Sequence, residues 1–183
     1  MTHRALDLSA INFLLVDDDA YMRGIIKSIL HAFGARNIRE ASDGDSAFKL
    51  LTAASSDIVI TDWVMQPVDG IALTRRLRTG ADSPNPLIPI IMLSAYSHQK
   101  RVGIARDAGV DEFLTKPVSA KALYLRIEEV VLRRRKFVRC ATYFGPDRHR
   151  RKDNAYHGPR RRENDPPPAD TPHPAQNGAE PVE

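Results

Sequence analysis

The stretch DIVITDWVMQPVDGIALTRRLRTG, residues 57–80, contains one complete strand, turn and helix. It begins with an apolar run that stops at Asp62, passes through a turn marked by Pro67 and Gly70, and ends in a segment with apolar residues at helical spacing. A continuous apolar run is typical of a strand that is buried on both faces. The stretch therefore predicts a buried strand that presents a carboxylate at its end.

The same order of strand and helix occurs five times between residues 12 and 135. The expected strands are residues 12–16, 37–41, 57–61, 89–93 and 112–115. The expected helices are residues 22–33, 46–54, 71–80, 99–109 and 119–135, the last with Ser119 as its N-cap. This alternation predicts an α/β fold, a doubly wound five-stranded parallel sheet with five helices on its two faces.

Length and composition are consistent with one ordinary domain and an appendage. The chain has 183 residues, of which 42% are hydrophobic, which is enough to build a substantial core. Its single cysteine, Cys140, has no partner for an internal disulfide, which favours a reducing compartment. The first residues lack the long apolar segment of a signal peptide or membrane span. We therefore expect a cytoplasmic location and no membrane contact.

The basic charge of the chain is concentrated in its last part. Residues 1–132 contain 15 lysines and arginines against 16 acidic residues, whereas residues 133–183 contain 12 against 7. Eight of the 13 prolines also lie beyond residue 132. This composition predicts a folded domain over residues 10–134 and a basic, proline-rich and disordered tail over residues 135–183.

Polar residues follow the predicted strands at the edge where ligands collect in doubly wound sheets. Asp17, Asp18 and Asp19 follow the first strand, Asp62 the third, Ser94 the fourth and Lys116 the fifth. Clustered carboxylates repel one another unless a cation lies among them, and Mg²⁺ prefers such oxygen ligands. A lysine and a hydroxyl beside them could hold phosphoryl oxygens. The set predicts a site for phosphoryl transfer with Mg²⁺ as cofactor.

Four motifs together resemble the receiver domain of bacterial two-component response regulators. They are the pair Asp17-Asp18, the stretch DWVMQPVDG from Asp62, the pair Ser94-Ala95, and FLTKP ending in Lys116-Pro117. They occur in the family's order, on the expected strand ends, over about residues 10–132. The resemblance implies a flavodoxin-like, receiver-type fold in a stand-alone receiver with a basic C-terminal tail.

The resemblance also implies roles for single residues. Asp62 would be the phosphoacceptor that attacks the phosphohistidine of a histidine kinase or a phosphotransfer protein. Mg²⁺ would be bound by Asp18, Asp62 and the backbone carbonyl of Val64, with Asp17 acting through water. Such a protein is a phosphoacceptor rather than an enzyme, with self-phosphorylation and autodephosphorylation only. It would signal by phosphorylation-dependent contacts with an unknown downstream protein target.

The remaining implied roles concern the switch. Ser94 would move to meet the phosphoryl group, and Phe113 would be the aromatic side chain that rotates with it. Lys116 would pair with the phosphate, next to a cis bond to Pro117. The sequence departs from the family where Gln66 separates Met65 from the proline, and where Phe113 replaces the more usual tyrosine.

Two other functions fit parts of the sequence. An Asp-nucleophile phosphatase of the haloacid dehalogenase type would use Asp17 and Asp19, but Tyr21 stands where that family has threonine or valine. A nucleic-acid-binding regulator would act through the arginine-rich tail, although no helix-turn-helix pattern occurs there. The tail also repeats one pattern, YFGPDRHRR at residues 143–151 and YHGPRRRE at residues 156–163, whose docking function is one possibility beside a passive extension.

Overall fold

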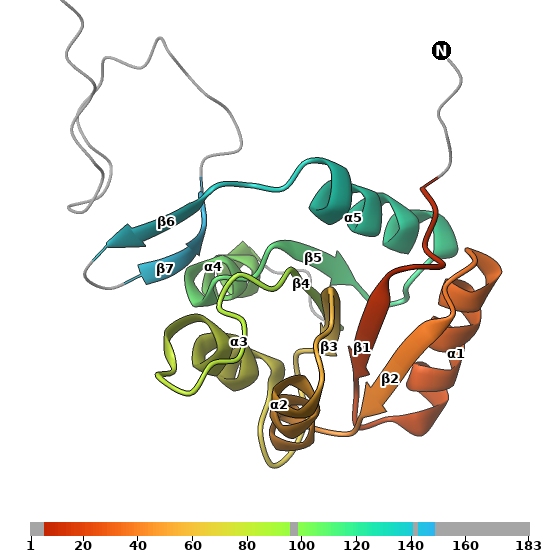
Figure 1. Cartoon of the computed structure of the whole chain (residues 1–183), viewed down its shortest axis with the longest axis horizontal. Helices are drawn as coiled ribbons and strands as arrows, with labels where there is room; N and C mark the ends of the chain where they lie inside the picture. Colours follow the sequence, from red (N-terminus) through yellow and green to blue (C-terminus); the bar gives the residue numbers. More distant parts are fainter. Residues whose placement is uncertain (1–5, 96–98, 141–142, 149–183) are drawn as a thin grey trace, which may run out of the picture. The chain divides into compact units, whose positions relative to one another are not determined.

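A five-stranded parallel sheet forms the centre of the domain (Figure 1). The computed structural model describes residues 6–95, 99–140 and 143–148. The strands are β1 (Asn12–Val16), β2 (Asn37–Ala41), β3 (Ile58–Asp62), β4 (Ile90–Ser94) and β5 (Glu112–Thr115). They lie in the order β2-β1-β3-β4-β5, and each pair of neighbours is parallel. The predicted α/β fold class is confirmed.

Helices cover both faces of this sheet (Figure 1). They are α1 (Ala20–Ala32), α2 (Gly44–Ala53), α3 (Gly70–Thr79), α4 (Gln99–Ala108) and α5 (Ala120–Leu132). On one face, α1 and α5 bury Ile26, Leu30, Leu123 and Ile127 against the strands. On the other face, α2, α3 and α4 bury Phe48, Leu73, Leu77 and Ala105. The sheet is therefore apolar on both sides, which explains the continuous apolar strands.

Side chains fix where several helices begin. Asp19 is the N-cap of α1 and accepts hydrogen bonds from the backbone N–H groups of Tyr21 and Met22. Ser119 caps α5 as predicted, because its hydroxyl accepts from the backbone N–H of Ala122 at 3.2 Å. These caps satisfy N–H groups that have no partner inside the helix. α5 ends at Leu132, a few residues before the predicted end at residue 135.

The turn after β3 requires glycine at position 70. The backbone N–H of Gly70 donates to the carbonyl of Trp63, which folds the loop back on the strand end. A Cβ atom at this position would lie 2.1 Å from the carbonyl oxygen of Asp62, so a larger residue would push the loop away. The same loop contains a cis peptide bond between Gln66 and Pro67. The pair Asp69-Gly70 thus holds the start of α3 close to Asp62, the candidate phosphoacceptor.

The prediction of a disordered tail from residue 135 is wrong for the first part of that segment. Two antiparallel strands follow α5, namely β6 (Phe137–Cys140) and β7 (Tyr143–Pro146). Phe137 packs against Phe144 with ring centroids 5.6 Å apart, and Tyr143 is buried. β7 packs against α3 and α4, which gives the hairpin a folded partner that composition alone did not reveal. The predicted disorder of residues 149–183 lies outside the described residues.

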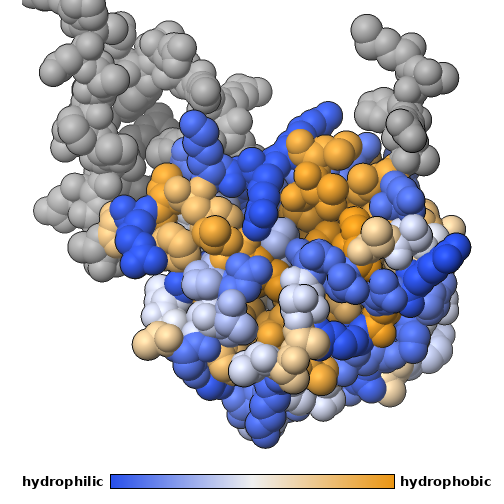
Figure 2. Space-filling model, in the orientation of Figure 1, coloured by the Kyte–Doolittle hydropathy of each residue, from blue (hydrophilic) through white to orange (hydrophobic). Residues whose placement is uncertain are grey.

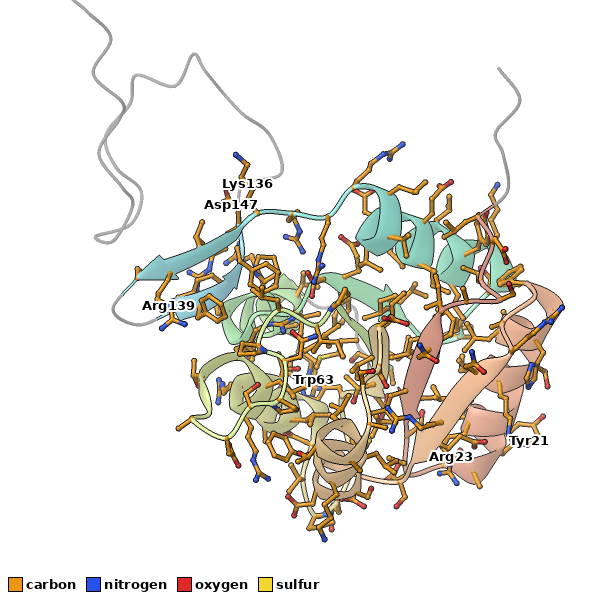
Figure 3. The ribbon with its side chains drawn as sticks, in the orientation of Figure 1. Tyr21, Arg23, Trp63, Lys136, Arg139 and Asp147 are labelled. Atoms are coloured by element: carbon orange, nitrogen blue, oxygen red, sulfur yellow. The ribbon has the colours of Figure 1, made fainter. Side chains whose placement is uncertain are left out.

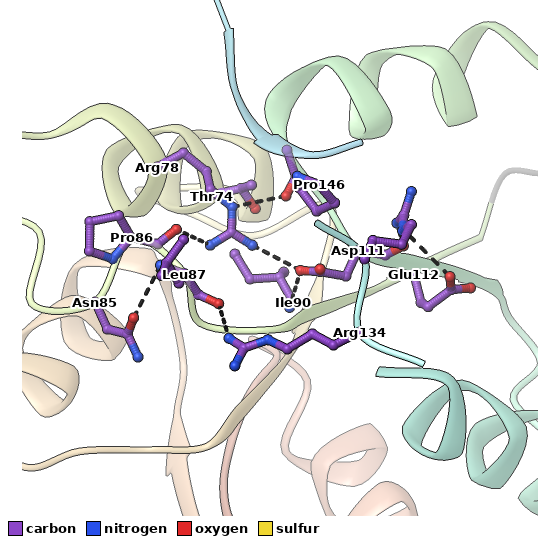
Figure 4. A network of polar contacts seen from close by, with 12 residues as sticks. Thr74, Arg78, Asn85, Pro86, Leu87, Ile90, Asp111, Glu112, Arg134 and Pro146 are labelled. Atoms are coloured by element: carbon purple, nitrogen blue, oxygen red, sulfur yellow. Dashed lines mark hydrogen bonds and ion pairs between the residues drawn. The ribbon is translucent and has the colours of Figure 1, made fainter. Parts of the chain in front are cut away.

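A buried arginine lies beneath the hairpin (Figure 4). The side chain of Arg78, on α3, is fully buried and forms an ion pair of 2.9 Å with Asp111. It also donates to the carbonyl oxygens of Gly109 and Pro86 at 3.0 and 2.8 Å. Asp111 accepts a further hydrogen bond from the backbone N–H of Ile90. The pair thus ties α3 to the amino ends of β4 and β5.

Two arginines of the chain after α5 extend this network. Arg134 donates to the carbonyl of Leu87, just before β4, and Arg135 donates to the carbonyl of Asp111, just before β5. Arg135 also donates to the carbonyl of Asp147, at the end of the hairpin. Figure 3 shows Lys136, Arg139 and Asp147 along the hairpin. Part of the basic charge after α5 is therefore used to attach the hairpin to the domain.

The surface carries both charged and apolar side chains. Figure 2 shows apolar residues gathered over α5, where Leu125, Val131 and Leu132 are exposed. Among the helices that the structure describes, none has the length and apolar character needed to cross a membrane.

The contribution of the Arg78–Asp111 pair to the stability of the domain can be tested by mutation. Burial lowers the pKa of Arg78 to about 10, but the group still carries its charge at neutral pH. Replacing Asp111 by alanine should therefore leave a buried charge without its partner and lower the free energy of unfolding by about 3–5 kcal/mol. Urea denaturation followed by circular dichroism measures the change.

Asp82→Ala is the matched control, because Asp82 forms a 2.7 Å ion pair with Arg76 on the exposed surface. Its loss should cost less than about 1 kcal/mol. Similar losses for the two variants would contradict the structural role of the buried pair.

Candidate functional site

The carboxyl ends of four strands place the predicted site residues at one edge of the sheet. Asp62 is the last residue of β3 and pairs in register with Leu93 of β4. Ser94, the next residue of β4, pairs with Thr115, the last residue of β5. Lys116 follows β5, and its backbone N–H donates to the carbonyl of Ser94 at 2.8 Å. The sheet itself therefore brings these residues together, as the sequence predicts.

Three carboxylates meet at this edge. Asp17, Asp18 and Asp62 each offer an oxygen atom, and these atoms lie within 4.8 Å of one another. Asp17 and Asp62 are buried, whereas Asp18 is exposed to solvent. A set of oxygen ligands with one open side suits Mg²⁺, which keeps several water molecules when it binds. The donor set thus fits the ion that the sequence predicts.

Lys116 links two of these carboxylates. Its Nζ atom lies 2.9 Å from Oδ2 of Asp17 and 2.8 Å from Oδ1 of Asp62. Burial alone would lower the pKa of Lys116, but the hydrogen bonds and negative charges of Asp62 and Asp17 outweigh it and raise the pKa. The lysine is therefore fully charged at neutral pH. The peptide bond to Pro117 is cis, as the resemblance implies.

Asp62 is held at both of its carboxylate oxygens. Oδ1 contacts Lys116, and Oδ2 accepts a hydrogen bond of 3.1 Å from the backbone N–H of Val64. Burial raises the pKa of Asp62, and the nearby charge of Asp17 raises it further, although Lys116 and Val64 act in the opposite direction. Asp62 is thus a carboxylate with reduced solvation in a fixed orientation.

Asp17 is positioned by residues that sequence reasoning missed. Arg23, on the first turns of α1, donates from Nη1 to the backbone carbonyl of Asp17 at 2.6 Å. Arg23 in turn forms an ion pair with Glu40 of β2, which also binds Lys27. Figure 3 shows Arg23 beside α1. Arg23 follows the N-cap Asp19 by four residues, about one helical turn, which returns it to the side of the helix where the chain enters from β1.

Asp19 has a structural role rather than a place in the acidic group. Its side chain accepts the N–H groups at the start of α1, while its own N–H donates to Oδ1 of Asp17 at 2.9 Å. This arrangement orients the Asp17 carboxylate toward Lys116. Because Asp19 caps the helix, it is not available for the catalytic role that the phosphatase alternative assigns to it.

The predicted switch aromatic lies against the residue that follows Asp62. Phe113 is half-buried, and its ring meets that of Trp63 edge to face, with centroids 6.3 Å apart. The guanidinium of Arg101, on α4, lies 5.3 Å from the Trp63 ring centroid. Trp63 thus connects the strand end at Asp62 with β5 and α4.

Comparison with known proteins identifies the family. A family model described as the response regulator receiver domain matches residues 13–128. This chain belongs to that family. The chemotaxis protein CheY of Pseudomonas aeruginosa is 36% identical over 120 residues, which span 66% of this chain and 95% of that protein.

Solved receiver structures show the same fold. The receiver domain of a Francisella response regulator is 31% identical, with a TM-score of 0.61, over 67% of this chain and 98% of its own. A chain in the complex of CheX, CheY, BeF₃ and Mg²⁺ from Borrelia burgdorferi is 25% identical, with a TM-score of 0.58, over 66% and 88%. Membership of the receiver family excludes the haloacid dehalogenase alternative.

The raised pKa of Asp62 gives a stability test in the absence of metal. A carboxyl group whose pKa is higher in the folded state opposes folding once it is ionised. Asp62→Asn should therefore unfold at higher urea concentration than the wild type at pH 7, with a chelator present. The difference should shrink as the pH falls through the raised pKa of the folded state, and it should vanish below the unfolded pKa near 3.8, where both states bind the proton. A variant less stable than the wild type at pH 7 would show that Lys116 outweighs burial.

Proposed function

We propose that this receiver domain acts in a phosphorelay and accepts a phosphoryl group from a histidine kinase or a phosphotransfer protein on Asp62. The observation that carries the proposal is the position of the Asp62 carboxylate. It lies at the end of the central strand β3, 2.8 Å from the ammonium group of Lys116 and within the group of three carboxylates. A nucleophile, a cation and metal ligands thus converge on one point.

The proposed reaction is a phosphoryl transfer between two side chains. An oxygen of Asp62 attacks the phosphorus atom of the donor's phosphohistidine. A P–O bond forms while the P–N bond breaks, and the histidine nitrogen keeps the electron pair. The product is a mixed anhydride on Asp62, which water later hydrolyses to phosphate and the free carboxylate. Burial supports this role, because a carboxylate with a raised pKa is a better nucleophile than one that is fully solvated.

Lys116 and Ser94 would hold the transferred group. Lys116 contacts Asp62 before transfer and would shift its ammonium donors to the phosphoryl oxygens, where charge and hydrogen bonds act together. Ser94 is buried at the end of the neighbouring strand β4, one position beyond the residue that pairs with Asp62. Its hydroxyl would donate to a second phosphoryl oxygen.

Mg²⁺ is the metal that the carboxylates fit. Asp18, Asp62 and the carbonyl of Val64 would hold the ion, with Asp17 acting through water. When bound, it would supply positive charge that offsets the phosphoryl oxygens. Lys116 and Arg23 keep Asp17 in place for this role through the contacts at its carboxylate and carbonyl.

The proposed output is a protein contact that depends on phosphorylation. Movement of Ser94 toward the phosphoryl group would change the packing of Phe113, which Trp63 and Arg101 connect to α4. A downstream protein target would recognise that altered surface. In the function proposed here the protein catalyses only its own phosphorylation and dephosphorylation.

Nucleic-acid binding through the basic tail, residues 135–183, has less support than protein contact. Arg134 and Arg135 donate to carbonyl groups of the domain, so their charge serves the fold. Lys136 and Arg139 are exposed but lie singly on the hairpin. Salt-dependent retardation of DNA by the full chain is the observation that would favour this alternative.

Replacing Asp62 by asparagine tests the phosphoacceptor. The variant should lose phosphoryl incorporation by at least about 100-fold, because the amide is a poor nucleophile and cannot form the mixed anhydride. The measurement is intact mass after incubation with acetyl phosphate and Mg²⁺. Asp69→Asn is the control, since Asp69 only caps α3 and asparagine is also a good N-cap. Undiminished incorporation in Asp62→Asn would overturn the proposal.

Metal binding has its own test without phosphorylation. Trp63 is the only tryptophan in the chain and follows Asp62 directly, so its fluorescence should respond to Mg²⁺. Millimolar Mg²⁺ should also raise the melting temperature by a few degrees, because the ion relieves repulsion among the carboxylates. In Asp18→Ala, both effects should require at least about tenfold more Mg²⁺ than in the wild type. Asp82→Ala should leave both effects unchanged. Absence of both responses in the wild type would mean that the carboxylates do not form a metal site.

A further inference from the structure

Strand β7 contains a sequence pattern that occurs twice in this chain. Residues 143–148 read Tyr-Phe-Gly-Pro-Asp-Arg, and residues 156–161 read Tyr-His-Gly-Pro-Arg-Arg. Tyrosine, glycine, proline and the final arginine recur at identical spacing. The structure shows how the first segment binds to the domain, so the role of each shared residue can be identified.

The tyrosine and the arginine of the first segment act together. Tyr143 is 7% exposed, and its hydroxyl donates to the carbonyl of Pro146 at 2.7 Å. The guanidinium of Arg148 lies 3.8 Å from the centroid of the Tyr143 ring and 3.5 Å from Oδ1 of Asp107, at the end of α4. The arginine therefore joins the tyrosine ring to the domain through a cation–π contact and an ion pair.

The glycine permits a close approach of two backbones. A Cβ atom at position 145 would lie 2.6 Å from the hydroxyl oxygen of Tyr143 and 2.9 Å from the Cα atom of Gly109. Gly109, in the turn after α4, has a φ of +99°, and a Cβ atom there would lie 2.9 Å from Cγ of Arg78. Glycine is thus required on both sides of the contact.

The surface that receives the segment is built by the domain itself. We call it the α4 socket and define it by Arg78, Asp107 and Gly109. Arg78 is held by the carbonyl groups of Gly109 and Pro86 and by Asp111, which all precede the hairpin in the chain. The socket is therefore supported by α3, α4 and β5 rather than by the segment that it binds.

The two segments differ at two of their six positions. Phe144, whose ring contacts Phe137 and the guanidinium of Arg139, corresponds to His157, which also has a planar ring. Asp147 corresponds to Arg160, but Asp147 binds Lys136 and Arg135 through its backbone N–H and carbonyl. Any residue except proline, which lacks the backbone N–H, can make these backbone contacts.

We propose that the α4 socket binds segments of the form Tyr-x-Gly-Pro-x-Arg, and that residues 156–161 of the same chain are its second occupant, in exchange with residues 143–148. Strand β6 would remain in place and pair with either segment. The connection after Cys140 would lengthen from two residues to 15, and the cost of closing a loop grows only with the logarithm of its length. Attachment to the same chain gives the second segment a high effective concentration at the socket.

The test uses the full chain and compares Tyr143→Ala, Tyr156→Ala and the double variant. Hydrogen exchange, read by mass spectrometry over residues 105–112 and 136–140, reports occupation of the socket. If residues 156–161 can replace residues 143–148, hydrogen exchange in Tyr156→Ala should match that of the wild type. In Tyr143→Ala, hydrogen exchange should be faster than in the wild type by less than about tenfold. The double variant should exchange at least about tenfold faster than Tyr143→Ala. Tyr21→Ala, at an exposed tyrosine of α1, is the control.

Two outcomes would overturn the proposal. Equal exchange in Tyr143→Ala and the double variant would show that the second segment does not enter the socket. Protection in Tyr143→Ala that rises with protein concentration over a tenfold range would mean that a second copy of the chain supplies the segment, which contradicts exchange within one chain.

A milder pair of variants covers the case in which loss of Tyr143 unfolds the domain. Arg148→Ala removes the cation–π contact with Tyr143 and the ion pair with Asp107, and under the proposal Arg161→Ala would remove the same contacts from the second segment. We expect hydrogen exchange in the double variant to be faster than the effects of the two single variants together predict. Strict additivity in this pair would also contradict the proposal.

Discussion

The contact of one lysine with two buried carboxylates holds the functional edge of this domain together. Asp17 follows β1 and Asp62 ends β3, while Lys116 reaches both from the far side of β4. Without the ammonium group, two negative charges would lie close together in a poorly solvated place. The lysine therefore does two things at once. It makes the arrangement of acids tolerable in the folded protein, and it keeps a cation beside the proposed nucleophile.

The central part of this edge was predictable because it depends on strand ends. Continuous apolar runs locate β1, β3 and β4, and a parallel sheet aligns their carboxyl ends whatever the details of packing. Asp17, Asp62, Ser94 and Lys116 therefore follow from the sequence. The support given by Arg23 does not, because its contact with the Asp17 carbonyl depends on the placement of α1 against the sheet.

The hairpin shows where composition misleads. Arginines and prolines after α5 resemble a solvated extension, yet Arg134 and Arg135 donate to carbonyl groups at the start of β4 and β5. Whether an arginine is solvated or bound depends on acceptors elsewhere in the fold, which composition does not contain. A local signal did exist. Phe137, Tyr143 and Phe144 lie in two short runs joined by two residues, which is typical of a hairpin.

The hairpin and the acidic edge lie at opposite ends of the strands. Arg135 binds the carbonyl of Asp111 at the amino end of β5, and Lys116 follows the carboxyl end of the same strand. Five residues of extended chain span about 16 Å, which is about two Debye lengths at physiological ionic strength. Salt screens a charge at Asp62 less than this distance suggests, because Asp62 is buried and the path to the hairpin runs through the sheet. The charge at Asp62 and the arginines of the hairpin therefore act on one another through the interior of the domain.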